Sequence, residues 1–108
     1  MSEDSPLLDT IVDMTAASVS RTSLSGRELM MVRIGALAAV DAPLSSYYLN
    51  MGIAIEAGLT AEDAQGVLVA VAPIIGAPKA VAAAATIAEA YGFALAIDEA
   101  IQERQSPG

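Results

Sequence analysis

Apolar residues recur at spacings of three and four along most of the chain, which is the spacing of one face of an α-helix. No segment shows the strict alternation of apolar and polar residues that is typical of a half-buried strand. Alanine, which has the highest intrinsic helix propensity, occurs 23 times. The pattern therefore predicts an all-α fold, a small bundle of about five to six helices.

The first two predicted helices differ in how their apolar residues are distributed. The first begins after Ser5 with Pro6 in its first turn and loosens over residues 18–23; its apolar positions are Leu7, Leu8, Ile11, Val12 and Met14. The second begins at Ser25, where Glu28 three residues later completes a capping box. Residues 29–40 are apolar on nearly every side except at Arg33, which predicts burial all round, in the centre of the bundle or at a subunit interface.

Turn and cap residues delimit the later helices. We expect Asp41 to cap the third helix, which ends near Ala57 because Gly58 suits a left-handed C-terminal position. Thr60 with Asp63 repeats the capping pattern for a short fourth helix, which Pro73 interrupts or kinks. The last segment, from residue 79 to about 103, is predicted to be one long helix or two, with the bend at Gly92, and Arg104 near its end.

Length and charge restrict the class of protein. The 108 residues make one domain, 1–108, with residues 1–5 and 105–108 expected to fray. The net charge of −8 repels nucleic acid and anionic lipid, so neither is an expected partner. The longest uncharged interval, residues 64–78, is shorter than the ~20 residues that span a bilayer, and the alanine-rich residues 80–97 suit a buried helix. The polar, acidic first residues resemble no secretory signal, and we expect a cytoplasmic protein.

Two residue types are absent from the sequence and exclude much chemistry. Without cysteine there is no disulfide, thiol nucleophile or thiolate metal site, and without histidine there is no imidazole base. The acidic residues show no metal-ligand spacing, so we expect no metal and no cofactor. The methionines Met14, Met30, Met31 and Met51 are interpreted as gap-filling core residues.

The alanine-rich composition also predicts self-association. Alanine lets helices approach closely but buries little apolar area, which makes a lone chain of this size marginally stable. Smooth helix faces of small residues suit pairing with copies of the same chain. We therefore expect a homo-oligomer.

Residues 24–78 resemble the carboxymuconolactone decarboxylase family, which includes the alkylhydroperoxidase D-like proteins. The matching phrases, in the family's order, are REL at 27–29, VRIGALAAV at 32–40, SSY at 45–47, EAGLTAED at 56–63, VL at 67–68 and APIIGAP at 72–78. The resemblance implies a small all-α fold whose chains associate as trimers, hexamers or related rings.

The resemblance also shows where this chain departs from the family. Its redox branch uses Cys-x-x-Cys-x-x-x-His before the Ala-Gly-x-Thr turn, and these positions fall on Pro43, Ser46 and Asn50. A hydroxyl and a carboxamide cannot cycle between thiol and disulfide, so thiol peroxidase chemistry is not expected. The family also has a glutamate on this helix. If the REL phrase is aligned with the family, that glutamate corresponds to Glu28; if Arg33 is aligned instead, it corresponds to Met30.

The candidate site residues each have two interpretations. Glu28 is a catalytic acid or base in a dry pocket, or only the capping-box carboxylate. Arg33 binds a substrate carboxylate, or forms a buried ion pair with Asp41, Glu28 or a neighbouring subunit. Asn50 is a catalytic or pocket residue one turn from Ser46, or makes a hydrogen bond between helices.

The tyrosines at 47 and 48 complete the candidates: their hydroxyls contact a ligand, or the two side chains are core residues with one polar tip exposed. The leading hypothesis is a protein without thiol chemistry that binds or transforms a small organic acid or lactone. In it, the catalytic residues are Glu28 and Asn50, and the binding residues are Arg33, Ser46 and Tyr47. As an enzyme it is a cofactor-free, decarboxylase-like lyase, with Glu28 or Asp41 supplying the proton. The alternative is a non-catalytic, self-assembling structural protein.

Overall fold

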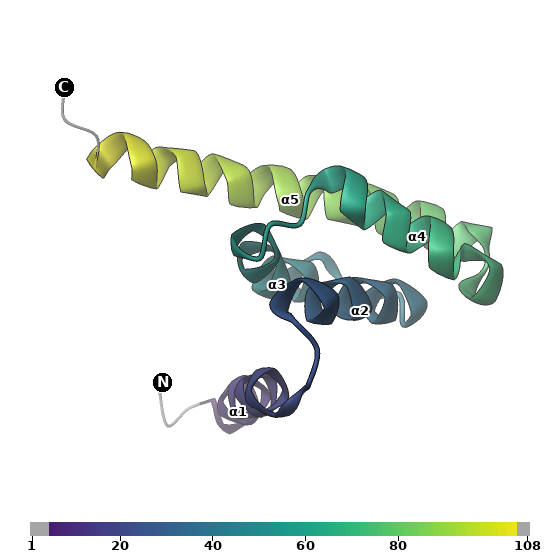
Figure 1. The fold of residues 1–108 in the computed structure, drawn as a ribbon, viewed down its shortest axis with the longest axis horizontal. Helices are drawn as coiled ribbons and strands as arrows, with labels where there is room; N and C mark the ends of the chain where they lie inside the picture. Colours follow the sequence, from purple (N-terminus) through teal and green to yellow (C-terminus); the bar gives the residue numbers. More distant parts are fainter. Residues whose placement is uncertain (1–4, 106–108) are drawn as a thin grey trace.

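The computed structural model describes residues 5–105, with side chains at 5–92, 100 and 102–104. These residues form five α-helices and no β-strand, which agrees with the predicted all-α fold (Figure 1). Apart from Ser5 and Gln105, the ends for which fraying is predicted lie outside the described residues. The helices are α1 (Pro6–Arg21), α2 (Gly26–Ala39), α3 (Leu44–Glu56), α4 (Ala61–Ile75) and α5 (Ala77–Gln105).

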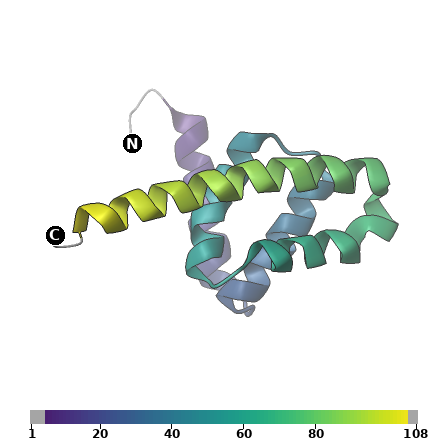
Figure 2. The same cartoon turned by 90° about the horizontal axis from the view of Figure 1, so that it is seen from above.

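The helices are arranged in layers, with α2 and α3 between α1 on one side and α4 and α5 on the other (Figure 1). The turn at Gly76 joins α4 to α5, and the two helices lie side by side. α5 continues past the other helices (Figure 2). α1 projects from the bundle and has no buried residue. The four helices α2 to α5 therefore carry the buried residues of the fold.

The core lies where α2 and α3 meet α4 and α5. Its largest fully buried side chains are Met30, Ile34, Tyr47 and Met51. Small residues complete it and let the helices approach closely; the buried alanines are Ala38, Ala54, Ala64, Ala83 and Ala90. At Gly35 the approach is so close that an added Cβ would lie 3.3 Å from the Val71 side chain on α4.

Three predicted helix boundaries are confirmed in atomic detail. Ser25 accepts a hydrogen bond from the backbone of Glu28, whose carboxylate accepts one from the backbone of Ser25, and Thr60 and Asp63 repeat this capping box. Gly58 has the left-handed φ of 87° after α3, where its N–H and that of Leu59 donate to the last turn.

The expectation that Asp41 caps the third helix is wrong. Asp41 ends α2 instead, with φ 58°, because its N–H bonds to Ala38 O and that of Ala42 to Leu37 O, as in a Schellman motif. The residue before Leu44 is Pro43, which is the N-cap of α3 and makes no side-chain cap. Aspartate tolerates the left-handed region better than most residues, so it takes the role that glycine has at position 58.

Other expectations also need correction. α1 continues to Arg21 instead of loosening at residue 18, and Met14 on it is 65% exposed, so it is not a core residue. α4 is not interrupted at Pro73 but continues to Ile75. α5 is one helix that begins at Ala77, which agrees with the one-helix alternative.

α2 is not buried all round within the chain. Met30, Ile34 and Ala38 lie in the core, while Val32 is 58% and Val40 72% exposed. The chain as a whole exposes 7117 Å², compared with about 5,600 Å² for a typical compact monomer of this mass. Its radius of gyration is 15.1 Å instead of about 13 Å, because α1 and the end of α5 project from the bundle.

Candidate functional site

A polar cluster joins three helices around Arg33. Arg33 lies half-buried on α2, where its Nη1 donates to Asn50 Oδ1 on α3 at 3.3 Å and its Nη2 donates to Ser18 Oγ on α1 at 2.9 Å. These bonds use two of the five N–H donors of the guanidinium. Three donors remain for a ligand.

Asn50 is oriented by its own helix. Its Nδ2 donates to the backbone carbonyl of Ser46 at 2.9 Å, one turn earlier on α3, which directs Oδ1 at Arg33. The predicted hydrogen bond between helices is therefore present. Ser46 contributes to the cluster through its carbonyl oxygen.

Arg33 has no carboxylate partner within the described part of the chain. The ion pair found there joins Arg27 Nη2 to Asp63 Oδ1 at 2.8 Å. The expected pairing with Glu28 or Asp41 is not formed: Glu28 points back to its own N-cap, and Asp41 lies in the left-handed turn after α2. An acid from a neighbouring subunit stays a prediction. Burial of a charge without an opposite charge is costly, which makes the neutral partners of Arg33 notable.

A groove with a volume of about 290 Å³ opens beside this cluster. Its lining residues are Thr15, Arg33, Ala36, Leu37, Val40 and Asn50. A cationic fork, an amide and a hydroxyl in an otherwise aliphatic surface suit a small molecule with one anionic group and an apolar body.

The other predicted site residues lie outside this groove. Glu28 is exposed, and its hydrogen bonds with Ser25 lower the pKa of its carboxyl, whereas a general acid in a dry pocket needs a raised pKa. Its capping interpretation is confirmed, and its catalytic role stays a prediction. Tyr47 is 1% exposed in the core, where burial, with a smaller effect from Asp41, raises the pKa of its hydroxyl. If Met30 holds the family's acidic position, that position is a fully buried core site.

Sequence reasoning missed the part of the site that comes from α1. The Oγ of Ser18 accepts a hydrogen bond from Arg33 Nη2, and Thr15 lines the groove. Both lie in the middle of the apolar face of α1, between Ile11 and Val19 at helical spacing. Two polar residues that interrupt an apolar face are the signal that could have identified them.

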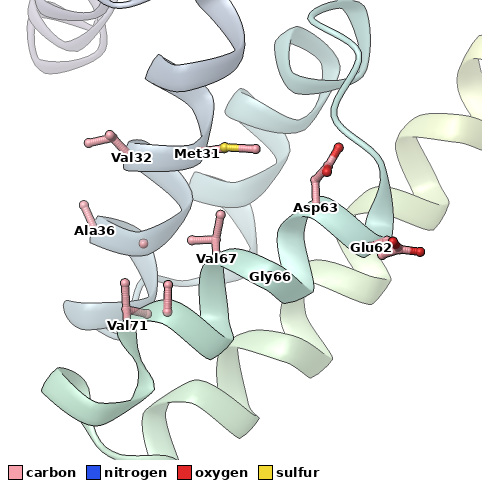
Figure 3. Close-up of a pocket in the computed structure, with 10 residues that line it drawn as sticks. Met31, Val32, Ala36, Glu62, Asp63, Gly66, Val67 and Val71 are labelled. Carbon is pink, nitrogen blue, oxygen red and sulfur yellow. The ribbon is translucent and has the colours of Figure 1, made fainter.

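A second and larger groove runs between α2 and α4, with a volume of about 640 Å³ (Figure 3). Its walls are aliphatic or small, with Val32 and Ala36 on α2 and Gly66, Val67 and Val71 on α4. The acidic residues Glu62 and Asp63 lie at the end formed by the first turn of α4 (Figure 3). This groove contains none of the predicted site residues.

Two features are absent from the described residues. No group of three or more acidic residues is arranged to hold a metal ion in this part of the chain. None of the helices, as far as the structure describes them, is long and apolar enough to cross a membrane.

The fold and the Arg33 cluster define a small all-α protein with an apolar groove that contains one cationic side chain. The model of the carboxymuconolactone decarboxylase family matches residues 6–90, which include every residue of the Arg33 groove. The chain belongs to this family, as the resemblance implied. Comparisons with curated proteins and with solved structures found no match.

Proposed function

We propose that this protein binds a small organic carboxylate, such as a carboxylated lactone, in the groove beside Arg33. The observation that carries the proposal is a half-buried guanidinium with only neutral partners, Asn50 and Ser18. A ligand carboxylate supplies the missing negative charge and accepts two parallel hydrogen bonds from the planar fork. The family's name refers to a substrate with these groups, which supports the same ligand class.

The aliphatic part of the groove complements the apolar body of such a ligand. Ala36, Leu37 and Val40 line it, and Val40 is 72% exposed. Removal of apolar surface from water contributes roughly 25 cal/mol per Å², while Arg33 fixes the orientation of the ligand. The hydroxyl of Thr15 is a further hydrogen-bond partner for a lactone oxygen.

Catalysis needs one group more than binding does. Loss of carbon dioxide breaks a carbon–carbon bond and leaves the electron pair on the substrate, which must then take up a proton. Among the described residues, the groove lining includes no carboxylic acid, and Glu28 and Asp41 lie outside it. The geometry therefore supports binding more directly than decarboxylation, and a lyase would take this proton from solvent or from another copy.

Thiol peroxidase activity is not part of the proposal. The sequence contains no cysteine and no histidine, and Asn50 is at the position of the family's histidine. Peroxide reduction by a thiol requires an attacking thiolate, and this chain has none. We expect no thiol-dependent consumption of peroxide by the purified protein.

A second candidate function is that of a self-assembling structural protein. The exposed apolar residues of α1 and the large area exposed by the single chain favour it. It agrees with the expected homotrimer, hexamer or related ring. In this case the Arg33 cluster only joins α1 to the bundle.

Calorimetric titration with γ-butyrolactone-γ-carboxylate, with its methyl ester as the neutral control, distinguishes the two functions. We expect the acid to bind the wild-type protein, and Arg33→Gln to weaken binding by at least about tenfold, which corresponds to the loss of one charged hydrogen-bonded pair. The ester should bind weakly to both proteins. Equal binding of acid and ester, or no effect of Arg33→Gln in a folded protein, would contradict the binding function and leave the structural one.

A further inference from the structure

α1 carries an exposed line of residues that ends in a cation. Leu7 and Met14 are 73% and 65% exposed, the highest values among the large apolar residues of this helix. They lie seven residues apart, close to two full turns, and Arg21 follows seven residues later on the same side. Asp9 and Asp13 project from another side, because successive helical residues are rotated by about 100°.

This line has no partner within the described part of the chain. No residue of α1 is buried, and Arg21 forms no ion pair with any residue whose side chain the structure describes. The side chains that connect α1 to the bundle include Ser18, through Arg33, and Thr15, which lines the groove there. Both lie beside the Leu7–Met14–Arg21 line, so α1 can keep its place at Arg33 and still present that line to another surface.

The groove between α2 and α4 complements this line in shape and in charge. Gly66 and Ala70, one turn apart on α4, are the small residues of its lining, here called its floor, and an added Cβ at Gly66 would meet nothing within 4 Å. At the acidic end, Asp63 is paired with Arg27, whereas Glu62 is exposed and has no ion-pair partner in the described part of the chain. The groove therefore combines an apolar floor with one uncompensated negative charge.

The spacings of the two surfaces match. With a rise of about 1.5 Å per residue, Met14 lies about 10.5 Å along α1 from Arg21. Along α4, Gly66 lies about 6 Å and Ala70 about 12 Å from Glu62. When Arg21 meets Glu62, Met14 therefore reaches the floor formed by Gly66 and Ala70, and the space at Gly66 is open.

We propose that a second copy of this chain places its α1 in the groove between α2 and α4, with Arg21 on Glu62 and Met14 over Gly66 and Ala70. An amphipathic helix in an apolar groove is a common mode of recognition, and charges at its end determine direction and register. Because the two surfaces differ, each chain gives one helix and receives one, and a head-to-tail contact of this kind forms a ring when the rotation between copies closes. The proposal is independent of ligand binding at Arg33.

Charge reversal tests the register. Sedimentation velocity should show the wild-type protein as a closed oligomer, and Arg21→Glu or Glu62→Arg should each raise its dissociation constant by about tenfold or more, through like-charge repulsion. The double variant R21E/E62R restores an attractive pair and should recover most of the assembly. A monomeric wild-type protein, or a double variant no better than the single ones, would overturn the proposal.

Filling the groove tests the surface. Gly66→Leu should abolish assembly without disturbing the fold of the single chain, since the space at Gly66 is open. Gly52→Leu is the matched control, because Gly52 is also an exposed helical glycine with nothing within 4 Å, and it lies on α3 outside the groove. An intact oligomer in Gly66→Leu, or equal losses in both variants, would overturn the assignment of this groove.

Cross-linking tests which chain supplies α1. The sequence contains no cysteine, so Met14→Cys and Gly66→Cys introduce unique thiols. A mixture of the two single variants should form a disulfide-linked dimer under mild oxidation, while each variant alone should form far less. If the double variant M14C/G66C instead closes its disulfide within one chain, α1 occupies the groove of its own chain and the proposal is wrong.

Discussion

Arg33 on α2 donates a hydrogen bond to Asn50 on α3 across 3.3 Å, so this charged side chain is paired there with a neutral amide. Asn50 is in turn fixed by the carbonyl of Ser46. The amide orients the guanidinium without neutralising it, so the positive charge is available to an external anion. This relationship is the basis of the proposed carboxylate site.

Replacement of Asn50 by aspartate should block the proposed carboxylate site, because the new side chain competes with the ligand for Arg33. In Asn50→Asp, a carboxylate of the chain itself neutralises Arg33, and we expect the affinity for γ-butyrolactone-γ-carboxylate to fall by at least about tenfold. Calorimetric titration measures the affinity, and circular dichroism checks that the variant is folded. An unchanged affinity in the folded variant would show that the ligand binds elsewhere.

The Asp63 carboxyl should make stability depend on pH. Its hydrogen bond with Arg27, followed by that with Thr60, lowers its pKa from 3.8 to about 2. Because the pKa is lower in the folded state, the stabilisation is complete above pH 4 and is lost as the pH falls from about 4 to about 2. Urea unfolding across this range should show a steeper loss in the wild-type protein than in Asp63→Asn, and parallel curves would contradict the assignment.

The glycines at positions 35 and 52 should respond in opposite ways to substitution. A Cβ at Gly35 lies 3.3 Å from Val71, so Gly35→Leu overfills the contact between α2 and α4 and should lower the free energy of unfolding by about 2 kcal/mol. Gly52 has open space around it, so Gly52→Ala should raise that free energy by up to about 1 kcal/mol. Urea unfolding measures both, and a stable Gly35→Leu variant would show that this contact is loosely packed.

Met30 provides a test of the family's acidic position. Its side chain is fully buried, so Met30→Glu places a carboxyl without a partner in the core and should cost about 3 kcal/mol or more at neutral pH. Burial raises the pKa of that carboxyl, so the loss should be smaller below pH 4, where it is protonated. Met30→Leu, as a control, should cost less than about 1.5 kcal/mol. A stable Met30→Glu variant would show that a cavity or partner accepts the acid.

Local sequence rules predicted the elements that depend on neighbouring residues. Ser25 with Glu28, Thr60 with Asp63, and Gly58 each act within one turn of helix, so their residue types and spacing determine the structure. Asp41 satisfies two local rules, as an N-cap and as a left-handed residue. Which of the two roles Asp41 takes depends on how α2 and α3 pack against each other, and the spacing of residues in the sequence does not specify that packing.

The candidate site was predicted in part. Arg33 and Asn50 were identified because a charge and an amide are unusual among apolar helical neighbours, and the structure brings them together. Ser18 and Thr15 were missed because their contribution requires the position of α1 relative to α2. Tyr47 lies on the same helix as Asn50 but faces the core. A spacing of three residues alone does not determine which of the two side chains faces the core and which faces the groove.

The most direct test of the carboxylate site is to observe the Arg33 side chain during ligand titration. In ¹⁵N NMR spectra, with Arg33 assigned by comparison with Arg33→Gln, the account predicts a saturable shift of the Arg33 Nε–H on addition of γ-butyrolactone-γ-carboxylate. The signals of Arg21, Arg27 and Arg104 should move far less, and the methyl ester should leave Arg33 unchanged. An unmoved Arg33 signal at saturating acid, or the same shift with the ester, would contradict the account.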